Sequence, residues 1–147
     1  MEAIVGDVII LRGLPGIGKT TLAGIIARAE NSVILSADDF FTKNDAYSFK
    51  KEDMQQAYEF TFNRFKKEVE KKTPLIIIDN SNIECFHYFH YLDYGQRNNY
   101  RVSILTIPHN DVSDRGVSER SPHKVTKSVI YAMRQKWQWD LDKNRKG

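Results

Sequence analysis

The residues best suited to chemistry form a glycine-rich segment near the start of the chain, GLPGIGKT at Gly13–Thr20. It matches the P-loop pattern G-x-x-x-x-G-K-T, in which glycines allow the backbone N–H groups to wrap around phosphate oxygens. An apolar run precedes the segment and an amphipathic one follows it, so a helix N-terminus adds positive charge to the site. The alternative is a glycine-rich turn with an incidental lysine. The context favours binding of a nucleoside triphosphate.

Positions within this segment have different expected roles. Lys19 reaches the β and γ phosphates, and the Thr20 hydroxyl binds the Mg²⁺ that bridges them. Thr21 is a candidate contact to the α phosphate. The other candidate cofactor-binding positions are Gly13, Pro15, Gly16, Ile17 and Gly18.

Acidic residues follow two of the apolar runs that are expected to form strands. Asp38 and Asp39 lie in SADDFF, and Asp79 lies in IIIDNSN. A carboxylate beside the phosphates can accept a proton from an attacking hydroxyl, or hold Mg²⁺ directly or through water. The alternative for the acidic pair is a helix N-cap or a turn. We favour a functional role for Asp38, while for Asp39 both interpretations remain open.

The segment DVSDRGVSERSPHKVT carries two candidate catalytic arginines, Arg120 and, as second choice, Arg115. Phosphoryl transfer spreads negative charge over the transferred group, and an arginine on a mobile lid can stabilise that charge. A solvated basic surface is the alternative for each arginine.

Hydrophobic periodicity predicts strands that alternate with helices. The expected strands are 7–12, 33–36, 75–79 and 101–107, and the expected helices are 19–29, 52–72, 84–98 and one from about 124, with a surface loop over 42–51. The helix residues expected to face the core are Leu22, Ile25, Ile26, Ala29, Met54, Tyr58, Phe62, Phe65, Val69, Phe86, Phe89, Leu92, Val129, Ile130, Met133 and Trp137. Such alternation indicates an α/β protein of the P-loop NTPase fold, with a parallel sheet of four or five strands and helices on both faces. Ligands then bind at the carboxyl ends of the strands.

Length and composition fit one globular domain spanning 1–147. Hydrophobic residues make up 41% and charged residues 28% of the chain, which is ordinary for a folded soluble protein. No apolar run approaches the roughly 20 residues of a membrane span, so we expect no membrane partner. The N-terminus lacks the layout of a secretory signal, so we expect a cytoplasmic protein. The net charge of +3 tolerates a polyanionic partner without requiring one.

Taken together, RGLPGIGKTTLA, ILSADDFF, PLIIIDNSN and NNYRVSILTIP resemble the polynucleotide 5′-hydroxyl kinase-like branch of P-loop kinases. That branch includes the kinase domain of bacteriophage polynucleotide kinase, the P-loop domains of cyclic nucleotide phosphodiesterase and zeta-toxin type, and the kinase-like domain of ubiquitin-ligase-binding proteins. The resemblance extends from about Asp7 to Trp137. The P-loop alone is common to many families, whereas SADDFF and IIIDNSN in this order are much more specific.

The resemblance implies transfer of the γ-phosphate of ATP, with Mg²⁺, to the 5′-hydroxyl end of RNA or DNA. Asp38 then matches the general base, Arg120 matches the lid arginine, and Asp79 and Asn82 match a Walker-B-like segment. Asp39, Asp79 and Asn82 are the expected substrate-binding residues. A ligase or phosphatase that completes end repair would be a separate protein.

One position departs from the pattern of the phage enzyme. The arginine that binds the acceptor phosphate three residues after the base is replaced here by Phe41, and Lys43 or Lys50 is a candidate substitute. The acceptor is therefore the least determined part of the prediction. A P-loop kinase for a small-molecule hydroxyl and a non-catalytic ATP-binding regulatory module are the alternatives.

Overall fold

The computed structural model describes residues 3–29, 31–43, 46–121, 123 and 125–139. Its centre is a four-stranded parallel sheet in the order β2-β5-β1-β6. The strands are β1 (Gly6–Arg12), β2 (Ser32–Leu35), β5 (Leu75–Asp79) and β6 (Tyr100–Thr106). The two central strands pair in the register Val8↔Ile76 and Ile10↔Ile78. The predicted parallel α/β sheet is confirmed.

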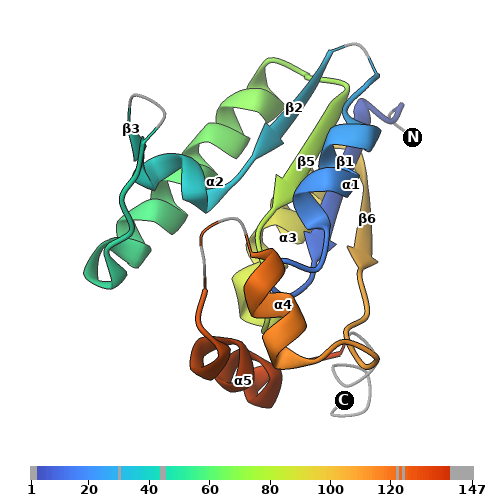
Figure 1. Ribbon diagram of the computed structural model, residues 1–147. Coiled ribbons are helices and arrows are strands. Elements are labelled where there is room, and N and C mark those ends of the chain that lie inside the picture. The colour runs from blue at the N-terminus through green and yellow to red at the C-terminus, as the bar shows by residue number, and fades with distance from the viewer. Residues whose placement is uncertain (1–2, 30, 44–45, 122, 124, 140–147) are drawn as a thin grey trace.

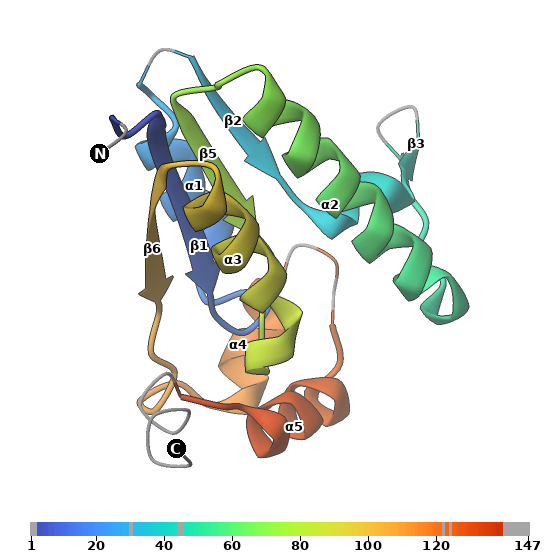
Figure 2. The ribbon, with the colours of Figure 1, turned by 180° about the vertical axis from the view of Figure 1, so that it is seen from behind.

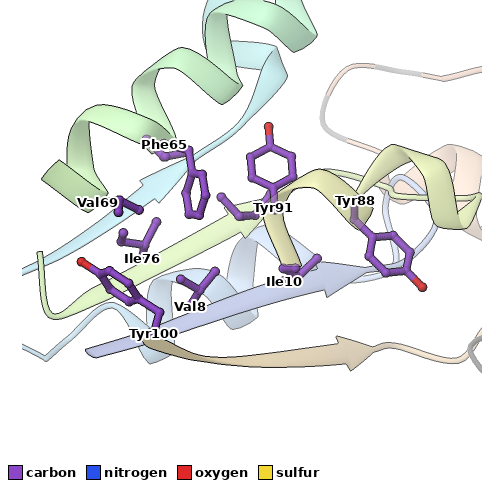
Figure 3. Packing of buried hydrophobic residues seen from close by; sticks show 10 residues of the cluster. Val8, Ile10, Phe65, Val69, Ile76, Tyr88, Tyr91 and Tyr100 are labelled. Carbon is purple, nitrogen blue, oxygen red and sulfur yellow. The ribbon is translucent and has the colours of Figure 1, made fainter. Parts of the chain in front are cut away.

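Helices cover both faces of this sheet (Figures 1 and 2). Helix α1 (Lys19–Ile26) lies on one face, and helices α2 (Met54–Glu70) and α3 (Phe89–Arg97) lie on the other. Ala23 of α1 packs in a buried cluster with Leu11 and Ile77. On the opposite face, strand residues pack against Phe65 and Tyr91, whose ring centroids are 5.1 Å apart (Figure 3). Each face of the sheet therefore has its own apolar core.

Two further helices, α4 (Asp114–Arg120) and α5 (Lys127–Lys136), lie beyond the carboxyl ends of the strands (Figure 1). They build a third buried cluster, in which Val117 and Ile130 pack with Leu14 of the glycine-rich loop. Helix α4 was not expected, because its sequence DRGVSER contains one apolar residue and so carries no helical stripe. In the described part of the chain, no helix is long and apolar enough to cross a membrane.

The other elements are short. They are the 3₁₀ turns η1 (Ala37–Phe41), η2 (Lys51–Asp53) and η3 (Cys85–His87), and the antiparallel pair β3 (Thr42–Lys43) and β4 (Ala46–Tyr47). The predicted surface loop over 42–51 therefore contains a small β pair. The helix predicted over 84–98 is also divided, because Tyr88 leaves helical geometry between η3 and α3.

Several helix residues expected to face the core are exposed, and these expectations were wrong. They are Ile25, Ala29, Tyr58, Phe86, Phe89 and Val129. In the region of η3 and α3, tyrosine side chains face the core in place of phenylalanines. Tyr88 and Tyr91 are buried, whereas Phe86 is 69% exposed. The helix itself begins at Phe89, so the stripe counted from residue 84 was out of phase with it.

Candidate functional site

The glycine-rich loop turns between the end of β1 and the start of α1. The N–H of Gly13 donates to the carbonyl of Ser81 at 3.1 Å, which ties the loop to the segment after β5. Gly16 and Gly18 have φ values of +81° and +113°, which L side chains rarely adopt. Gly18 is the N-cap of α1 and has no side chain to accept from the first N–H groups of the helix. These groups can therefore bind an anion.

Lys19 lies beside two of the predicted carboxylates. It is buried, and its Nζ donates to the carbonyl of Leu14 at 3.1 Å. Burial lowers the pKa of Lys19 to about 8, and the charges of Asp79 and Asp38 act in the opposite direction. The carboxyl ends of β2 and β5 thus bring both acidic residues close to the lysine of the loop.

Thr20 and Asp79 form a pair of oxygen donors at the end of β5. The Thr20 hydroxyl donates to Oδ2 of Asp79 at 3.1 Å. Burial raises the pKa of Asp79, while the charge of Lys19 and the hydrogen bond from Thr20 lower it. Hydroxyl and carboxylate oxygens are the ligands that Mg²⁺ prefers, so this donor set fits the predicted ion. Its role in metal binding stays a prediction.

Asp38 is held in place by the backbone of η1. Ser36 is the N-cap of this turn, and its Oγ accepts from the N–H of Asp38 at 3.1 Å. Oδ1 of Asn80, which directly follows β5, accepts from the N–H of Ala37 at 2.8 Å. The cap of η1 is thus a serine, which leaves both carboxylates of the acidic pair available for other contacts.

The side chains of Asp38 and Asp39 have different partners. Oδ1 of Asp38 accepts from the hydroxyl of Tyr47 at 3.4 Å, and its Oδ2 lies 3.5 Å from Nε2 of His123. Asp39 forms an ion pair with Arg64 of α2, with Nη1 and Oδ2 at 2.8 Å. Of these two aspartates, Asp38 is the one whose charge acts on the pKa of Lys19.

Asn82 holds the backbone of the strand that leads into the loop. It is buried, with φ of +51°, and its Nδ2 donates to the carbonyl of Leu11 at 2.7 Å. The backbone carbonyl of Asn82 accepts from Nε of Arg12 at 2.8 Å. The amide nitrogen is thus already used within the protein, and the expected contact of Asn82 with substrate stays a prediction.

The helix α4 touches the phosphate loop directly. A Cβ built on Gly16 would lie 2.3 Å from the carbonyl oxygen of Val117 and 3.1 Å from the carbonyl carbon of Arg120. The backbone of Arg120 therefore lies beside the loop. Arg115, in contrast, forms an ion pair with Glu119 at 2.9 Å on the exposed side of the helix. The side chain of Arg120 bonds within its own helix, with Nε donating to the carbonyl of Gly116 at 3.2 Å. The catalytic roles of both arginines stay predictions.

The remaining predicted residues lie on or next to the loop. Pro15 and Ile17 are half-buried, and Ile17 packs against the cluster formed by α4 and α5. Thr21 is exposed on the first turn of α1.

Three polar groups around Asp38 were not predicted as partners of this segment: the side chain of Asn80, the hydroxyl of Tyr47 and the ring of His123. Asn80 was recognisable in principle, because it directly follows a buried strand at the same edge of the sheet as Asp79. Tyr47 and His123 reach the site only through the β3–β4 pair and the segment after α4. No periodic pattern in the sequence indicates either approach.

The fold and the loop define a P-loop kinase-like domain. The chain belongs to a family described as AAA domain, whose model matches residues 8–138. Human NEDD4-binding protein 2 is 35% identical to this chain over 133 residues. That match covers 88% of this chain, and the chain spans about 8% of the length of that relative.

Solved structures share the fold at lower sequence identity. A chain in the structure of the Pnkp1/Rnl/Hen1 RNA repair complex superposes with a TM-score of 0.70 and 17% identity, covering 99% of this chain and 47% of that one. Kti12 from Chaetomium thermophilum, in complex with ADP-AlF3, superposes with a TM-score of 0.59 and 16% identity, covering 90% of this chain and 80% of that one. At these identities the similarity concerns the fold.

Proposed function

We propose that this domain is an ATP-dependent kinase that transfers the γ-phosphate to the 5′-hydroxyl end of a polynucleotide. The observation that carries the proposal is the position of Asp38. Its carboxylate follows the end of β2, and its charge partly opposes the lowering of the pKa of Lys19 by burial. A base for the acceptor and a cation for the donor phosphates therefore share one edge of the sheet.

The proposed reaction assigns one role to each group. Loop N–H groups and Lys19 hold the β and γ phosphates, and Thr20 and Asp79 would hold Mg²⁺, which supplies charge neutralisation at the transferred group. Asp38 takes the proton of the acceptor hydroxyl while that oxygen forms its bond to the γ-phosphorus. The bond between the γ-phosphorus and the bridging oxygen breaks, and ADP leaves with the electron pair. Arg120 stabilises the charge that spreads over the transferred group.

Aromatic side chains around Asp38 support a nucleic acid acceptor. The pKa of Tyr58 on α2 is raised by burial and also by the charge of Asp38. Phe49 is exposed and packs against Phe41, with ring centroids 5.2 Å apart. Exposed rings stack on nucleobases of any sequence, each contributing about 1–3 kcal/mol. The acceptor side thus offers π surfaces where a terminal base would lie.

We assign no residue to binding of the phosphate next to the acceptor hydroxyl. Phe41, at the position of the missing arginine, is buried and apolar. Lys50 stays a candidate for this contact, as does Lys43, whose side chain lies outside the described part of the chain. We therefore expect weaker dependence on an acceptor phosphate than in an enzyme that keeps the arginine.

The test is transfer of label from γ-labelled ATP with Mg²⁺ to short RNA and DNA oligonucleotides that carry a 5′-hydroxyl. The same oligonucleotides with a 5′-phosphate are the acceptor control, and Lys19→Ala is the enzyme control. We expect label only on the 5′-hydroxyl ends, and loss of that label in Lys19→Ala. The resemblance to the fold in an RNA repair complex makes RNA the first acceptor to try.

Two other outcomes contradict the proposal. Label on small polyols but not on oligonucleotides would indicate a small-molecule kinase. ATP binding without transfer to any acceptor would indicate a nucleotide-binding regulatory module. A separate ligase or phosphatase would act on the product if end repair is the pathway.

A further inference from the structure

Tyr47 and His123 form a stacked ring pair that joins two separate parts of the molecule. Their ring centroids are 3.6 Å apart and their planes differ by 16°. Tyr47 belongs to β4, and His123 lies between α4 and α5 in the sequence. The stack is therefore a direct contact between the β3–β4 pair and a residue that follows α4.

Both rings of this pair are directed at the same carboxylate. The Tyr47 hydroxyl lies 3.4 Å from Oδ1 of Asp38, and Nε2 of His123 lies 3.5 Å from Oδ2. Burial and the nearby charge of Asp38 raise the pKa of Tyr47 to about 12, so the hydroxyl keeps its proton and acts as a hydrogen-bond donor to the carboxylate. Both distances are long for hydrogen bonds, and contacts of this kind commonly shorten when substrates bind.

The pair lies at the margin of the apolar cores. Helices α4 and α5 share a buried cluster with Leu14 and Ile83 that includes neither ring. Tyr47 packs at the edge of a small cluster around Phe41, and the His123 side chain is 30% exposed. An aromatic pair contributes about 0.5–1.5 kcal/mol beyond its area burial, so removing the stack leaves the cores intact.

We propose that Tyr47 and His123 are positioning residues that fix the orientation of Asp38. The stack brings one proton donor to each oxygen of the carboxylate, and this holds Asp38 in the rotamer in which it accepts the acceptor proton. The inference rests on the proposed function, because it assigns to Asp38 the role of base.

Three substitutions separate the stack from the polar contacts. Tyr47→Phe and His123→Phe keep two stacked rings and each remove one contact to Asp38. His123→Gln keeps a side-chain donor and removes the ring. His90→Gln is the matched control, because His90 packs against Phe62 between α2 and α3, away from this pair.

We expect Tyr47→Phe and His123→Phe to lower kcat about tenfold, the effect of losing roughly one charge-assisted hydrogen bond, with KM for ATP unchanged. His123→Gln should show a smaller loss than His123→Phe, since it retains the donor. Wild-type kcat in both phenylalanine variants would overturn the proposal. A rise in KM for ATP with unchanged kcat would also overturn it, because that pattern indicates a role in nucleotide binding.

Hydrogen exchange provides a readout that does not depend on transfer activity. His123→Gln should speed amide exchange both in the β3–β4 pair and in α4, whereas Tyr47→Phe and His90→Gln should leave exchange in these elements unchanged. Unchanged exchange in His123→Gln would show that the stack does not couple the two parts. If the wild-type protein transferred no phosphate to any 5′-hydroxyl, the proposed function would fail, while this experiment would still decide whether the stack joins β4 to the part of the chain that follows α4.

Discussion

Gly16 and Gly18 both have positive φ in the phosphate loop, but their surroundings differ. The carbonyl of Val117 lies where a Cβ of residue 16 would be, whereas nothing lies within 4 Å of a Cβ at residue 18. A side chain at residue 18 thus strains the backbone of the loop but meets no neighbouring atom. At residue 16 it also forces the loop and α4 apart.

We therefore expect Gly16→Ala to lower the free energy of unfolding more than Gly18→Ala does. Gly18→Ala should lower the free energy of unfolding by about 1–3 kcal/mol, the usual cost of a strained backbone conformation. Gly16→Ala should cost more than this and should also weaken ATP binding. Urea denaturation and calorimetric titration measure the two effects. Equal losses in both variants would show that α4 does not press on the loop.

The lowered pKa of Lys19 predicts that the free energy of unfolding of the protein depends on pH. Below about pH 8 the amine is charged in both the folded and the unfolded chain, so the cost of burying the charge is present in full. As pH rises from about 8 towards the ordinary value of 10.5, the folded protein binds fewer protons than the unfolded chain, so its stability increases. Above both values the penalty is absent.

Lys19→Met removes this buried charge. At pH 7 and without nucleotide, we expect the variant to have a higher free energy of unfolding than the wild-type protein while binding no ATP. The advantage should shrink as pH rises through the range from about 8 to 10.5. Denaturant unfolding of both proteins at several pH values measures the difference. A constant advantage across this range would contradict the assigned burial penalty.

At the scale of elements, the strands were predictable, and the inward faces of the helices were predictable in part: Phe65, Val69 and Ile130 are buried as expected, whereas Phe86 and Phe89 are exposed. Runs such as LIIID at 75–79 identify buried parallel strands by composition alone, and all four have the expected positions within a residue or two. Val117 of α4 is buried only because α5 and the phosphate loop pack on it, and this tertiary contact leaves no periodic signal. The same limit applies to the site. Lys19, Asp38 and Asp79 follow from strand ends, whereas Tyr47 and His123 depend on how short segments fold back.

Arg12 joins strand β1 to the C-terminal part of the chain. Its guanidinium is fully buried, donates to the backbone carbonyls of Ile83 and Gln138, and lies 4.6 Å from the centroid of the Trp137 ring. Because β1 leads directly into the phosphate loop, this contact also fixes the loop relative to α5.

We expect Arg12→Met to lower the free energy of unfolding by about 3 kcal/mol or more, since it removes a buried donor to the carbonyls of Asn82, Ile83 and Gln138. Among these carbonyls, in the described part of the chain, Ile83 alone keeps a backbone donor, the N–H of Gln138. Arg101→Met is the control, because Arg101 forms an exposed ion pair with Asp7 at 2.6 Å and should change stability little. Urea denaturation compares the two variants. A similar small effect in both would show that the Arg12 network does not stabilise the fold.

At the scale of the whole molecule, the two faces of the sheet and the helices α4 and α5, here called the lid, have different apolar clusters. The sheet clusters contain strand residues and α1, α2 and α3, whereas the lid cluster contains Ile130 of α5 with Leu14 of the loop. The lid is joined to the sheet through this loop and through Arg12, so we expect it to open locally at a lower free energy than the sheet cores.

Ile130→Ala should therefore loosen the lid without unfolding the sheet. We expect faster amide exchange in α4 and α5 and little change in β1, β5 and β6, together with weaker ATP binding. Native-state hydrogen exchange measures the pattern. Uniformly faster exchange throughout the chain would show that lid and sheet open as one unit.

The most direct test of the account compares Asp38→Asn with Asp39→Asn in single-turnover transfer of labelled phosphate to a 5′-hydroxyl oligonucleotide, with ATP affinity measured in parallel. The two substitutions make the same chemical change at neighbouring positions of η1, but Asp39 is ion-paired to Arg64. We expect Asp38→Asn to bind ATP normally and to lose transfer by about 10²–10⁴-fold, the usual contribution of a general base. Asp39→Asn should retain transfer within a few-fold of wild type. Wild-type transfer by Asp38→Asn would contradict its role as the base.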